Sequence, residues 1–441
     1  MLFLPGQPFA TIGALEVFNL VVLLTFTLCF TYQLVYIFVS LIKRPPQLTA
    51  KKNHRYAAMI CARDESKVIL DIIQSIRMQN YPAELIDIFV VADNCTDNTA
   101  EVAKAAGATV FVRRNQERTG KGYALEFGFA SIEEEYGIDA YEAYFVFDAD
   151  NVLDGNYFKE MNKAFDNGAV ACTSYRNAKN FASNWITAGY GIWFLREARY
   201  LNQARYLLNS SCAISGTGFF VSSELIKQNN GWHYHLLTED IEFSVDTVLK
   251  KQRISYAPAA VIYDEQPLTF KESWNQRLRW TRGIYQVFRR YGAKLLLGKL
   301  FFPKGHRFAC YDLLMTIAPA MMLMLTSLVV NLSVLVSGLL RVATPAMMTT
   351  AVYAVLFSLA FFGFFMFVFG LITTITERKR IRGTRAQKIA SVLSFPFFVL
   401  TYVPIAVTAL FKKPSWKPTR HSISVDVEEF GHYLSGEYER T

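Results

Sequence analysis

Hydrophobic residues along the chain form long apolar runs at both ends and short alternating segments between them. Residues 13–42 are one run with a single charge, Glu16, and later runs cover about 309–340, 345–375 and 390–411. About 20 apolar residues are enough to cross the hydrocarbon core of a bilayer. The first run follows no basic residue and is longer than the apolar core of a signal peptide, so we expect it to be a retained anchor.

The central region alternates between strand-like and helical patterns. Strands are predicted at 56–61, 86–93, 109–112 and 143–150, and helices at about 66–78, 97–106 and 156–166. This rhythm predicts an α/β domain with a largely parallel sheet and helices on both faces. Ligands of such sheets bind beyond the carboxyl ends of the strands. Polar residues at strand ends are therefore the candidates for a site.

Several of these strand-end residues are acidic. Asp93 ends the second predicted strand, and Asp148 and Asp150 end the fourth. Residues i and i+2 of a strand point to the same side, so the latter two carboxylates can converge. Mg²⁺ and Mn²⁺ prefer such oxygen ligands. Aspartate is also a common turn residue, which is the alternative interpretation of each position.

A second acidic motif, Thr238-Glu239-Asp240, precedes a helical pattern. A threonine cap followed by acids that complement the helix dipole would explain it without chemistry. His233 and His235 lie just upstream, but no third ligand with metal-site spacing accompanies them. We expect these histidines to be structural or exposed.

Residues 271–290 interleave aromatic and apolar residues with arginines. This pattern is typical of a helix that lies in the membrane interface. Arg279 and Trp280 would then be a snorkelling arginine and a member of an aromatic belt.

Composition and charge limit the alternatives. The net charge is +9, with much of the excess beside the apolar runs, at Lys43, Arg44 and the basic stretch 378–388. The positive-inside rule places both regions in the cytoplasm. No basic run is interleaved with aromatics in the manner of a nucleic-acid site, so we expect no nucleic-acid partner. Six cysteines without CxxC spacing argue against a disulfide framework or zinc site and suit a reducing compartment.

The motifs together resemble the family-2 inverting glycosyltransferases, above all the membrane-integrated synthases of cellulose, hyaluronan and poly-β-1,6-N-acetylglucosamine. The similarity covers about residues 55–300, and the QxxRW element is its most specific part. In chain order the motifs are CARDE, VVADNCTDNT, TGKGYALEFGF, FDADN, ISGTGFFV, LTEDIEFS and NQRLRW.

The resemblance implies a GT-A-type nucleotide-sugar-binding α/β domain plus transmembrane helices, and a role for each matching residue. Donor-binding residues would be Glu65, Asp93, Lys121, Asp148, Gln276 and Arg279. Acceptor-binding residues would be Gly216 and Trp280. Asp240 would be the catalytic base beside Glu239, and Asp150 with Asp148 would hold Mg²⁺ or Mn²⁺. Ala92 stands where many members have a second acid.

The C-terminal tail carries a further motif. Trp416, Thr419 and Arg420 resemble the active-site gating motif of related synthases, which must reach the donor pocket. Residues 390–411 have basic residues on both flanks and contain Pro396 and Pro404. We therefore expect this segment to re-enter the membrane from the cytoplasm rather than cross it.

The predicted organisation places the N-terminus outside a plasma membrane and the catalytic domain in the cytoplasm. It comprises an anchor at 1–44, the catalytic domain at 55–268, interfacial helices with QxxRW at 269–305, transmembrane or re-entrant helices at 309–411 and a cytoplasmic tail at 412–441.

Three function hypotheses follow. The first is an inverting hexosyltransferase that uses a UDP-sugar, extends a β-linked glucosamine- or glucose-based polymer and exports it. The second glycosylates a lipid acceptor once, as ceramide glucosyltransferases do. The third is a transporter or scaffold without catalysis, which leaves the ordered acids unexplained. With few spans, a polymer channel is lined either by one copy alone or together with an accessory membrane subunit or a second copy in a homo-oligomer, and the sequence leaves both open.

Overall fold

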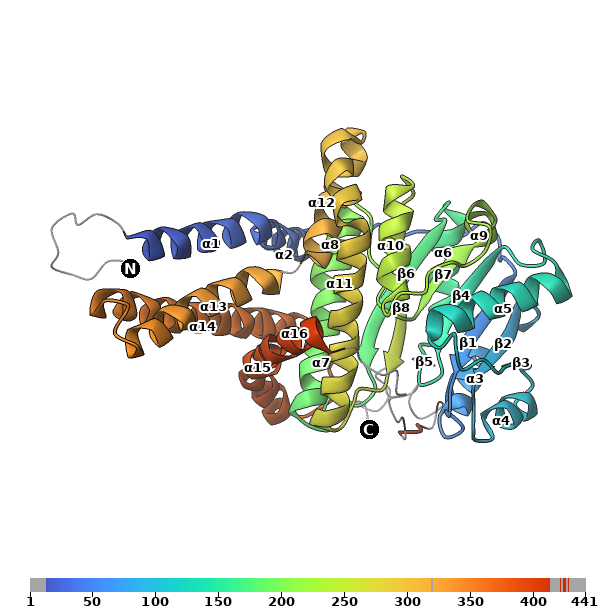
Figure 1. The fold of residues 1–441 in the computed structure, drawn as a ribbon. Coiled ribbons are helices and arrows are strands. Elements are labelled where there is room, and N and C mark those ends of the chain that lie inside the picture. Colours follow the sequence, from blue (N-terminus) through green and yellow to red (C-terminus); the bar gives the residue numbers. More distant parts are fainter. Residues whose placement is uncertain (1–12, 319, 413–420, 422, 426, 428–441) are drawn as a thin grey trace.

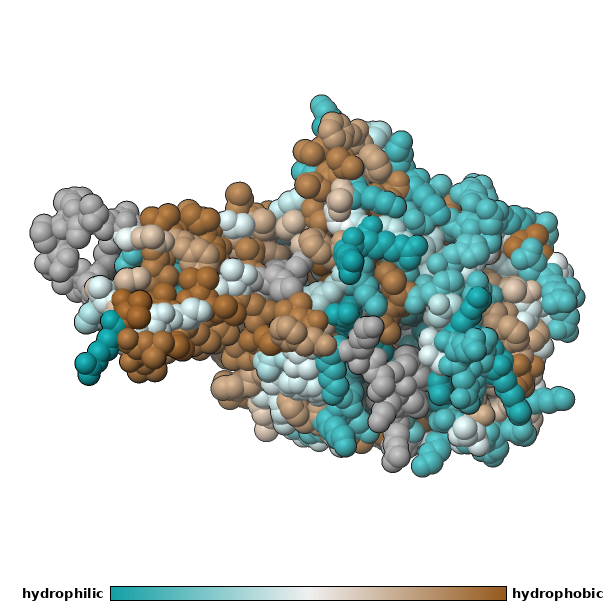
Figure 2. All heavy atoms as spheres, viewed as in Figure 1, coloured by the Kyte–Doolittle hydropathy of each residue, from teal (hydrophilic) through white to brown (hydrophobic). Residues whose placement is uncertain are grey.

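The computed structural model describes residues 13–318, 320–412, 421, 423–425 and 427. Within them an α/β domain lies beside a group of apolar helices, and long helices stand between the two (Figure 1). Hydrophobic side chains dominate the surface of the helical end, and hydrophilic side chains dominate the visible face of the α/β domain (Figure 2). The long apolar runs and the central region of the sequence thus form separate regions of the molecule.

The α/β domain is built on one sheet, which has eight strands in the described part of the chain. The strands are β1 (Tyr56–Ala62), β2 (Ile86–Asp93), β3 (Thr109–Arg113), β4 (Ala143–Asp148), β5 (Val152–Leu153), β6 (Ala171–Ala178), β7 (Phe219–Ser222) and β8 (Ile254–Asp264). Their order is β3-β2-β1-β4-β7-β6-β8-β5.

The directions of the strands confirm the predicted largely parallel sheet, with two exceptions. Strands β3, β2, β1 and β4 are parallel, as expected, but β7 is antiparallel to both β4 and β6, and β5 is antiparallel to β8. Strands β6 and β8 run in the same direction as the first four, so the sheet is largely parallel, as predicted, and β7 and the short β5 are the exceptions. Strand β7 is reversed because the connection after β6 leaves the sheet as helices and returns to the end it left, whereas a βαβ crossover returns to the opposite end.

Helices cover both faces of the sheet, as predicted. One apolar core lies under α3 (Ile69–Arg77), α4 (Thr99–Ala105) and α6 (Tyr157–Asp166), and a second lies under α5 (Lys121–Tyr136). Two short helices, η1 (Ala83–Leu85) and α9 (Ser223–Gln228), complete this layer. Helix α3 starts later than predicted because the amides of Glu65 and Ser66 bond to side chains of the loop at 97–99.

Three helices form a column at the border of the domain. They are α10 (Glu239–Leu249), α11 (Phe270–Phe301) and α12 (Lys304–Ile317), and they share an apolar core. The apolar run predicted at 309–340 is thus two helices, because α12 packs on α11 and ends before Pro319. Ala318 is extended, as residues before proline usually are.

The apolar helices gather at one end of the molecule. They are α1 (Ala14–Phe30), α2 (Tyr32–Ile42), α13 (Ala320–Leu339) and α14 (Pro345–Thr376). Helices α1, α13 and α14 pack together, and α11 runs across their ends (Figure 1). In the described residues, Ala14–Ile42, Pro345–Thr376 and Arg385–Phe411 are long and apolar enough to cross a membrane, and Leu325–Leu339 is a shorter apolar helix.

The segment Arg385–Phe411 packs differently from the other two. It is divided into α15 (Arg385–Leu400) and α16 (Tyr402–Phe411), which pack on α7 (Trp185–Arg196) and on α11. Arg277 of α11 donates to the hydroxyl of Thr401 at 2.6 Å, and Arg282 donates to the carbonyl of Ala409 at 3.0 Å. Of the most apolar stretch of this segment 44% is buried, compared with 6% for Pro345–Thr376.

Helix α7 continues through a π-helical segment, Glu197–Asn202, into α8 (Gln203–Leu207). Arg205 of α8 forms a buried ion pair with Asp312 of α12 at 2.7 Å. Tyr36 of α2 donates to the same carboxylate at 2.6 Å. This cluster joins the N-terminal apolar helix to the column.

Candidate active site

The carboxyl ends of the parallel strands open into a cavity of about 850 Å³. It is lined by every candidate site residue in the described part of the chain, namely Glu65, Asp93, Lys121, Asp148, Asp150, Gly216, Glu239, Asp240, Gln276, Arg279 and Trp280. Residues separated by more than 200 positions in the sequence thus meet at one site. Trp416, Thr419 and Arg420 lie outside the described residues.

Lys121 lies at the centre of the cavity's charged part. Its ammonium group contacts the carboxylate of Asp148 and donates to the carbonyl of Gly216 at 2.7 Å. Burial by itself would lower the pKa of Lys121, but Asp148 and Glu239 outweigh it and raise that pKa. The lysine is therefore a fixed positive charge at the first turn of α5, where the helix dipole also favours anions.

Asp93 is engaged inside the protein. Its carboxylate accepts from the guanidinium of Arg113 at 2.6 Å and from the side chain of Asn94 at 2.9 Å. Both partners of the ion pair are buried, and burial raises the pKa of Asp93 although Arg113 opposes it. Arg113 ends β3, next to β2, so the pair is positioned by strand pairing.

Asp148 and Asp150 line the same cavity and have different partners. Strand β4 ends at Asp148, so strand alternation does not extend to Asp150. Its carboxylate accepts from the amide of Glu265 at 2.9 Å and lies 3.8 Å from Nε2 of His421. Asp148 instead contacts Lys121.

His421 joins the C-terminal tail to this cluster. Its Nδ1 lies 2.8 Å from Oε1 of Glu65, whose Oε2 is buried with no hydrogen-bond partner among the described residues. Burial raises the pKa of Glu65 to about 7. Burial alone would lower the pKa of His421, but Asp150 and Glu65 outweigh it and raise that pKa to about 10. The acids therefore hold His421 as an imidazolium, which would have to lose a proton before it could bind a metal ion.

The acids of this cluster are candidate ligands of a divalent cation. Carboxylate oxygens and an imidazole nitrogen are the ligands that Mn²⁺ accepts, and oxygen ligands suit Mg²⁺. The 3.8 Å between Asp150 and His421 exceeds the roughly 3 Å between neighbouring ligands of an octahedral ion, so the two side chains would have to move closer to bind one ion side by side. The unpartnered oxygen of Glu65 lies in the same cluster.

The acidic pair at the start of α10 faces the same cavity. Thr238 does not cap the helix as predicted, because its hydroxyl makes no capping bond and is buried without a hydrogen-bond partner among the described residues. Asp240 accepts a hydrogen bond of 2.6 Å from the amide of Gly216. Burial and the neighbouring Asp240 raise the pKa of Glu239 to about 8, and burial also raises the pKa of Asp240. Raised carboxyl pKa values are characteristic of groups that exchange protons near neutral pH.

Helix α11 contributes the three residues of the QxxRW motif. Gln276 has a buried Oε1 without a hydrogen-bond partner among the described residues. Trp280 packs edge-on against Tyr190, with ring centroids 5.8 Å apart. Arg279 is half-buried, and among the described residues it forms no ion pair within 4 Å. It thus offers a guanidinium to an anion in the cavity.

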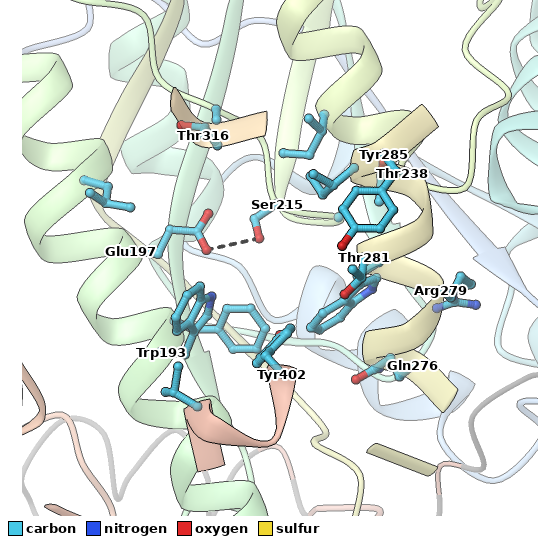
Figure 3. A pocket seen from close by; sticks show the side chains of 18 of the residues that line it. Trp193, Glu197, Ser215, Thr238, Gln276, Arg279, Thr281, Tyr285, Thr316 and Tyr402 are labelled. Carbon is cyan, nitrogen blue, oxygen red and sulfur yellow. Dashed lines mark hydrogen bonds between the residues drawn. The ribbon is translucent and has the colours of Figure 1, made fainter. Parts of the chain in front are cut away.

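A neck connects this charged part with the apolar helices. Figure 3 shows Trp193 and Glu197 facing Gln276 and Tyr285 of α11 across the cavity, with Tyr402 of α16 at the edge. The hydroxyl of Ser215 donates to Glu197 at 3.5 Å.

The sequence interpretation missed His421, Glu197 and Trp193. None belongs to a motif with a recognisable spacing. Glu197 and Trp193 lie on helices inserted between β6 and β7, and His421 comes from a tail more than 350 residues beyond Glu65. The only signal available was the position of His421 directly after the tail motif.

The chain matches the family model described as "Glycosyltransferase like family 2" over residues 54–283, which is more than half of its length. The chain belongs to this family. The matched range contains the strands that carry the acids, helix α10 and the QxxRW motif. The protein is therefore a member of a glycosyltransferase family, as the resemblance predicted.

The relatives of this chain are named for different products. The chain is 26% identical over 274 residues to a probable glycosyltransferase, YdaM, of Bacillus subtilis, covering 60% of this chain and 64% of the relative. It is 25% identical over 257 residues to a beta-monoglucosyldiacylglycerol synthase of Synechocystis, covering 56% and 52%. It is 25% identical over 254 residues to a poly-beta-1,6-N-acetyl-D-glucosamine synthase of Staphylococcus aureus, covering 56% and 59%. The match thus spans between half and two thirds of each relative.

The fold has a solved counterpart. The glycosyltransferase resembles the mannosyltransferase PcManGT from Pyrobaculum calidifontis, solved with GDP-Man and Mn²⁺, with a TM-score of 0.57 and 15% identity over 90% of this chain and 99% of the other. This likeness confirms the predicted GT-A-type fold with added apolar helices.

Proposed function

We propose that this glycosyltransferase transfers a hexose from a UDP-sugar, with inversion, to an acceptor hydroxyl at the neck of the cavity. One observation carries the proposal: the proposed base Asp240 lines the same cavity as the cations Lys121 and Arg279 and the aromatic Trp280. A base, an anion site and a sugar-stacking ring are the parts that direct displacement requires.

Asp240 takes the proton in this reaction. The acceptor oxygen attacks the anomeric carbon of the donor, the bond from that carbon to the diphosphate breaks, and the hydroxyl proton moves to the carboxylate of Asp240. The amide of Gly216, which donates to the same carboxylate, orients it. A single displacement inverts the anomeric centre, so an α-linked donor yields a β-linked product.

The donor's diphosphate is held by groups that the protein leaves available. Arg279 can present two N–H donors to phosphate oxygens, and Gln276 lies one turn before it on α11. Lys121 adds a point charge and would exchange its contact with Asp148 for one with phosphate. Glu65 and Asp93 lie at the ends of β1 and β2, where the uridine is expected, and the bond from Arg113 orients Asp93.

A divalent cation completes the proposed site. Asp150 and His421 would hold it, with Asp148 on the donor side. When bound, Mg²⁺ or Mn²⁺ neutralises charge that develops on the leaving diphosphate. The Mn²⁺ in the solved structure of the mannosyltransferase belongs to that protein and supports a cation of this kind here.

We also propose the topology. Basic residues beside α2 and α14 place the α/β domain in the cytoplasm, with the N-terminus outside. Ala14–Ile42, α13 and α14 cross the plasma membrane. Segment Arg385–Phe411 re-enters, because both of its halves bond to the column and His421 beyond it reaches Glu65.

Replacing Asp240 by Asn tests the catalytic assignment. Transfer from labelled UDP-sugars in membranes should fall by about 10²- to 10⁴-fold, the usual contribution of a general base, while UDP binding is retained. Asp246→Asn, on the same helix but bonded to Tyr234, is the matched control and should stay active. Equal activity of the two variants would remove Asp240 as the base.

Labelling tests the topology. A cysteine at position 342, in the exposed turn between α13 and α14, should react with an impermeant reagent in intact cells. A cysteine at position 435 should react only after the cells are opened. Labelling of position 435 from outside would show that Arg385–Phe411 crosses the membrane.

Two products agree with this mechanism. A polymer synthase would keep the elongating chain at Trp280, and a lipid glycosyltransferase would release its product after one transfer. Polymer export through so few spans would need a second copy or an accessory membrane subunit. Sizing of the labelled product separates the two.

A further inference from the structure

The cavity does not end at the QxxRW helix. It continues past the neck between the helices that we propose to cross the membrane, where α1, α13 and α14 all contribute to its wall. This intramembrane part is lined by Val22, Leu23, Phe26, Leu328, Ala354, Phe361, Phe365 and Phe369, among others. The catalytic acids and an apolar space inside the helical bundle are therefore parts of one continuous volume.

The lining of the intramembrane part is unsuited to sugars. Its wall consists mainly of hydrocarbon and phenyl groups, and two of its polar side chains, Asn19 and Ser327, are engaged in hydrogen bonds within the helical bundle. Asn19 and Asn331 exchange hydrogen bonds of 3.1 and 2.8 Å, and Ser327 donates to Asn19 at 3.4 Å. Each sugar hydroxyl buried there without a partner would carry a desolvation cost of several kcal/mol, on the order of 2–7. A hydrocarbon chain needs no such partner.

The dimensions suit acyl chains. Phe369 lies at the neck, where its ring is 5.1 Å from the guanidinium of Arg196. Ala354 also lines the cavity and lies nearer the start of the same helix, at the other end of the lining stretch 354–369. With a rise of 1.5 Å per residue, the distance between them along α14 is about 22 Å. One leaflet of the hydrocarbon core is about 15 Å thick, half of the roughly 30 Å total.

The neck carries a hydrogen-bond donor, Arg196, that could bind the polar headgroup of a lipid. Arg196 is half-buried, lines the cavity and donates to Oε1 of Gln33 at 2.6 Å. Among the described residues no carboxylate lies within 4 Å of its guanidinium. Its remaining N–H groups can donate to ester, hydroxyl or phosphate oxygens at the level where a lipid headgroup would sit.

We infer that the acceptor is a membrane lipid with a free headgroup hydroxyl, whose acyl chains occupy the intramembrane part of the cavity. This inference rests on the proposed function and chooses the lipid product over the polymer. The lipid hydroxyl oxygen forms the bond to the anomeric carbon, UDP departs with the electrons of the broken bond, and Asp240 receives the proton. The glycolipid then leaves sideways between the helices.

The test uses the purified full chain in phosphatidylcholine vesicles, which offer no headgroup hydroxyl. Diacylglycerol, phosphatidylglycerol or ceramide is added in separate arms with labelled UDP-glucose, UDP-galactose or UDP-N-acetylglucosamine. The expected product is soluble in organic solvent, carries one sugar and requires one of the added lipids. A photoactivatable form of that lipid should crosslink to residues 354–369.

A matched pair of variants tests the position of the chains. Ala354→Trp places an indole in the intramembrane cavity, and Ala360→Trp places one on the same helix at an exposed position outside the cavity lining. We expect Ala354→Trp to lower lipid glycosylation at least about tenfold with unchanged UDP affinity, and Ala360→Trp to be as active as the parent. Retained UDP binding shows that the variant is folded.

The outcomes separate the two proposals. A polymeric product, or equal lipid glycosylation by the two variants without crosslinking to α14, would overturn the lipid site but leave the glycosyl transfer intact. Absence of both UDP binding and turnover of every UDP-sugar would overturn the proposed function itself.

Discussion

The amide of Gly216 donates a hydrogen bond of 2.6 Å to Oδ2 of Asp240, and the carbonyl of the same glycine accepts one of 2.7 Å from Lys121. One peptide segment therefore touches both the proposed base and the proposed diphosphate cation. Gly216 has φ +79°, a conformation that L side chains rarely adopt. The turn before β7 thus sets the distance between the two groups.

Gly216→Ala tests this coupling. An added Cβ meets only Arg176, at 3.7 Å, so the main effect is backbone strain of about 1–2 kcal/mol. Relaxation of that strain would shift the amide from Asp240, and we expect kcat to fall about tenfold, which corresponds to about 1.4 kcal/mol. Gly137→Ala is the control, since Gly137 has φ +85° and open space around it. Both variants should lose similar stability; a similar loss of kcat in both would contradict the prediction.

The pH dependence of the reaction follows from the buried acids. Asp240 acts as a base only when ionised, and burial raises its pKa. The value of kcat/KM should therefore rise with pH along a limb that lies above the ordinary aspartate range near about 4. A limb at that ordinary value would show that Asp240 is not shifted in the free enzyme.

Glu239 supplies a second pH prediction. Its pKa of about 8 means that the carboxyl is neutral at pH 7, so glutamine is a close replacement. Glu239→Gln should keep most of the activity at pH 7, within about threefold, and should lose any inflection of the rate profile near pH 8. A loss as large as that of Asp240→Asn would mean that Glu239 is itself ionised and required.

His421→Ala tests the proposed cation site. Removal of an imidazole beside Asp150 should raise the Mn²⁺ concentration for half-maximal activity by about 10- to 100-fold. His233→Ala is the control, because His233 is exposed and bonds only to the carbonyl of Asn230. An unchanged or lower Mn²⁺ requirement would show that His421 pairs with the carboxylates but does not bind the cation.

The buried pair Arg205 and Asp312 predicts a stability effect remote from catalysis. Asp312→Asn leaves the guanidinium buried without its partner and should cost about 3–5 kcal/mol. The double variant Arg205→Met with Asp312→Leu should recover most of this loss. Thermal unfolding in detergent measures both, and Asp139→Asn, at an exposed pair with Lys227, should change little. A small effect of Asp312→Asn would show that water reaches the pair.

The local sequence pattern predicted helices and strands well where their formation depends mainly on their own residues. Short apolar runs located β1 and β2, and the helices after them were displaced by only a few residues. The same reasoning does not extend to Asp150, because strand alternation applies only as far as the strand continues and β4 ends at Asp148. It failed for the strand direction of β7, which depends on where a long helical excursion returns.

Sequence alone determined the family of this protein, the acids at the strand ends, the QxxRW residues and the two regimes of hydrophobicity, since each is a property of neighbouring residues. Only the tertiary structure joined Asp240 to Gly216, brought His421 to Glu65 and Asp150, and connected the catalytic cavity with the space between α1, α13 and α14. Such contacts join residues far apart in the chain and depend on how helices pack. The spacing of residues in the sequence therefore does not predict these contacts.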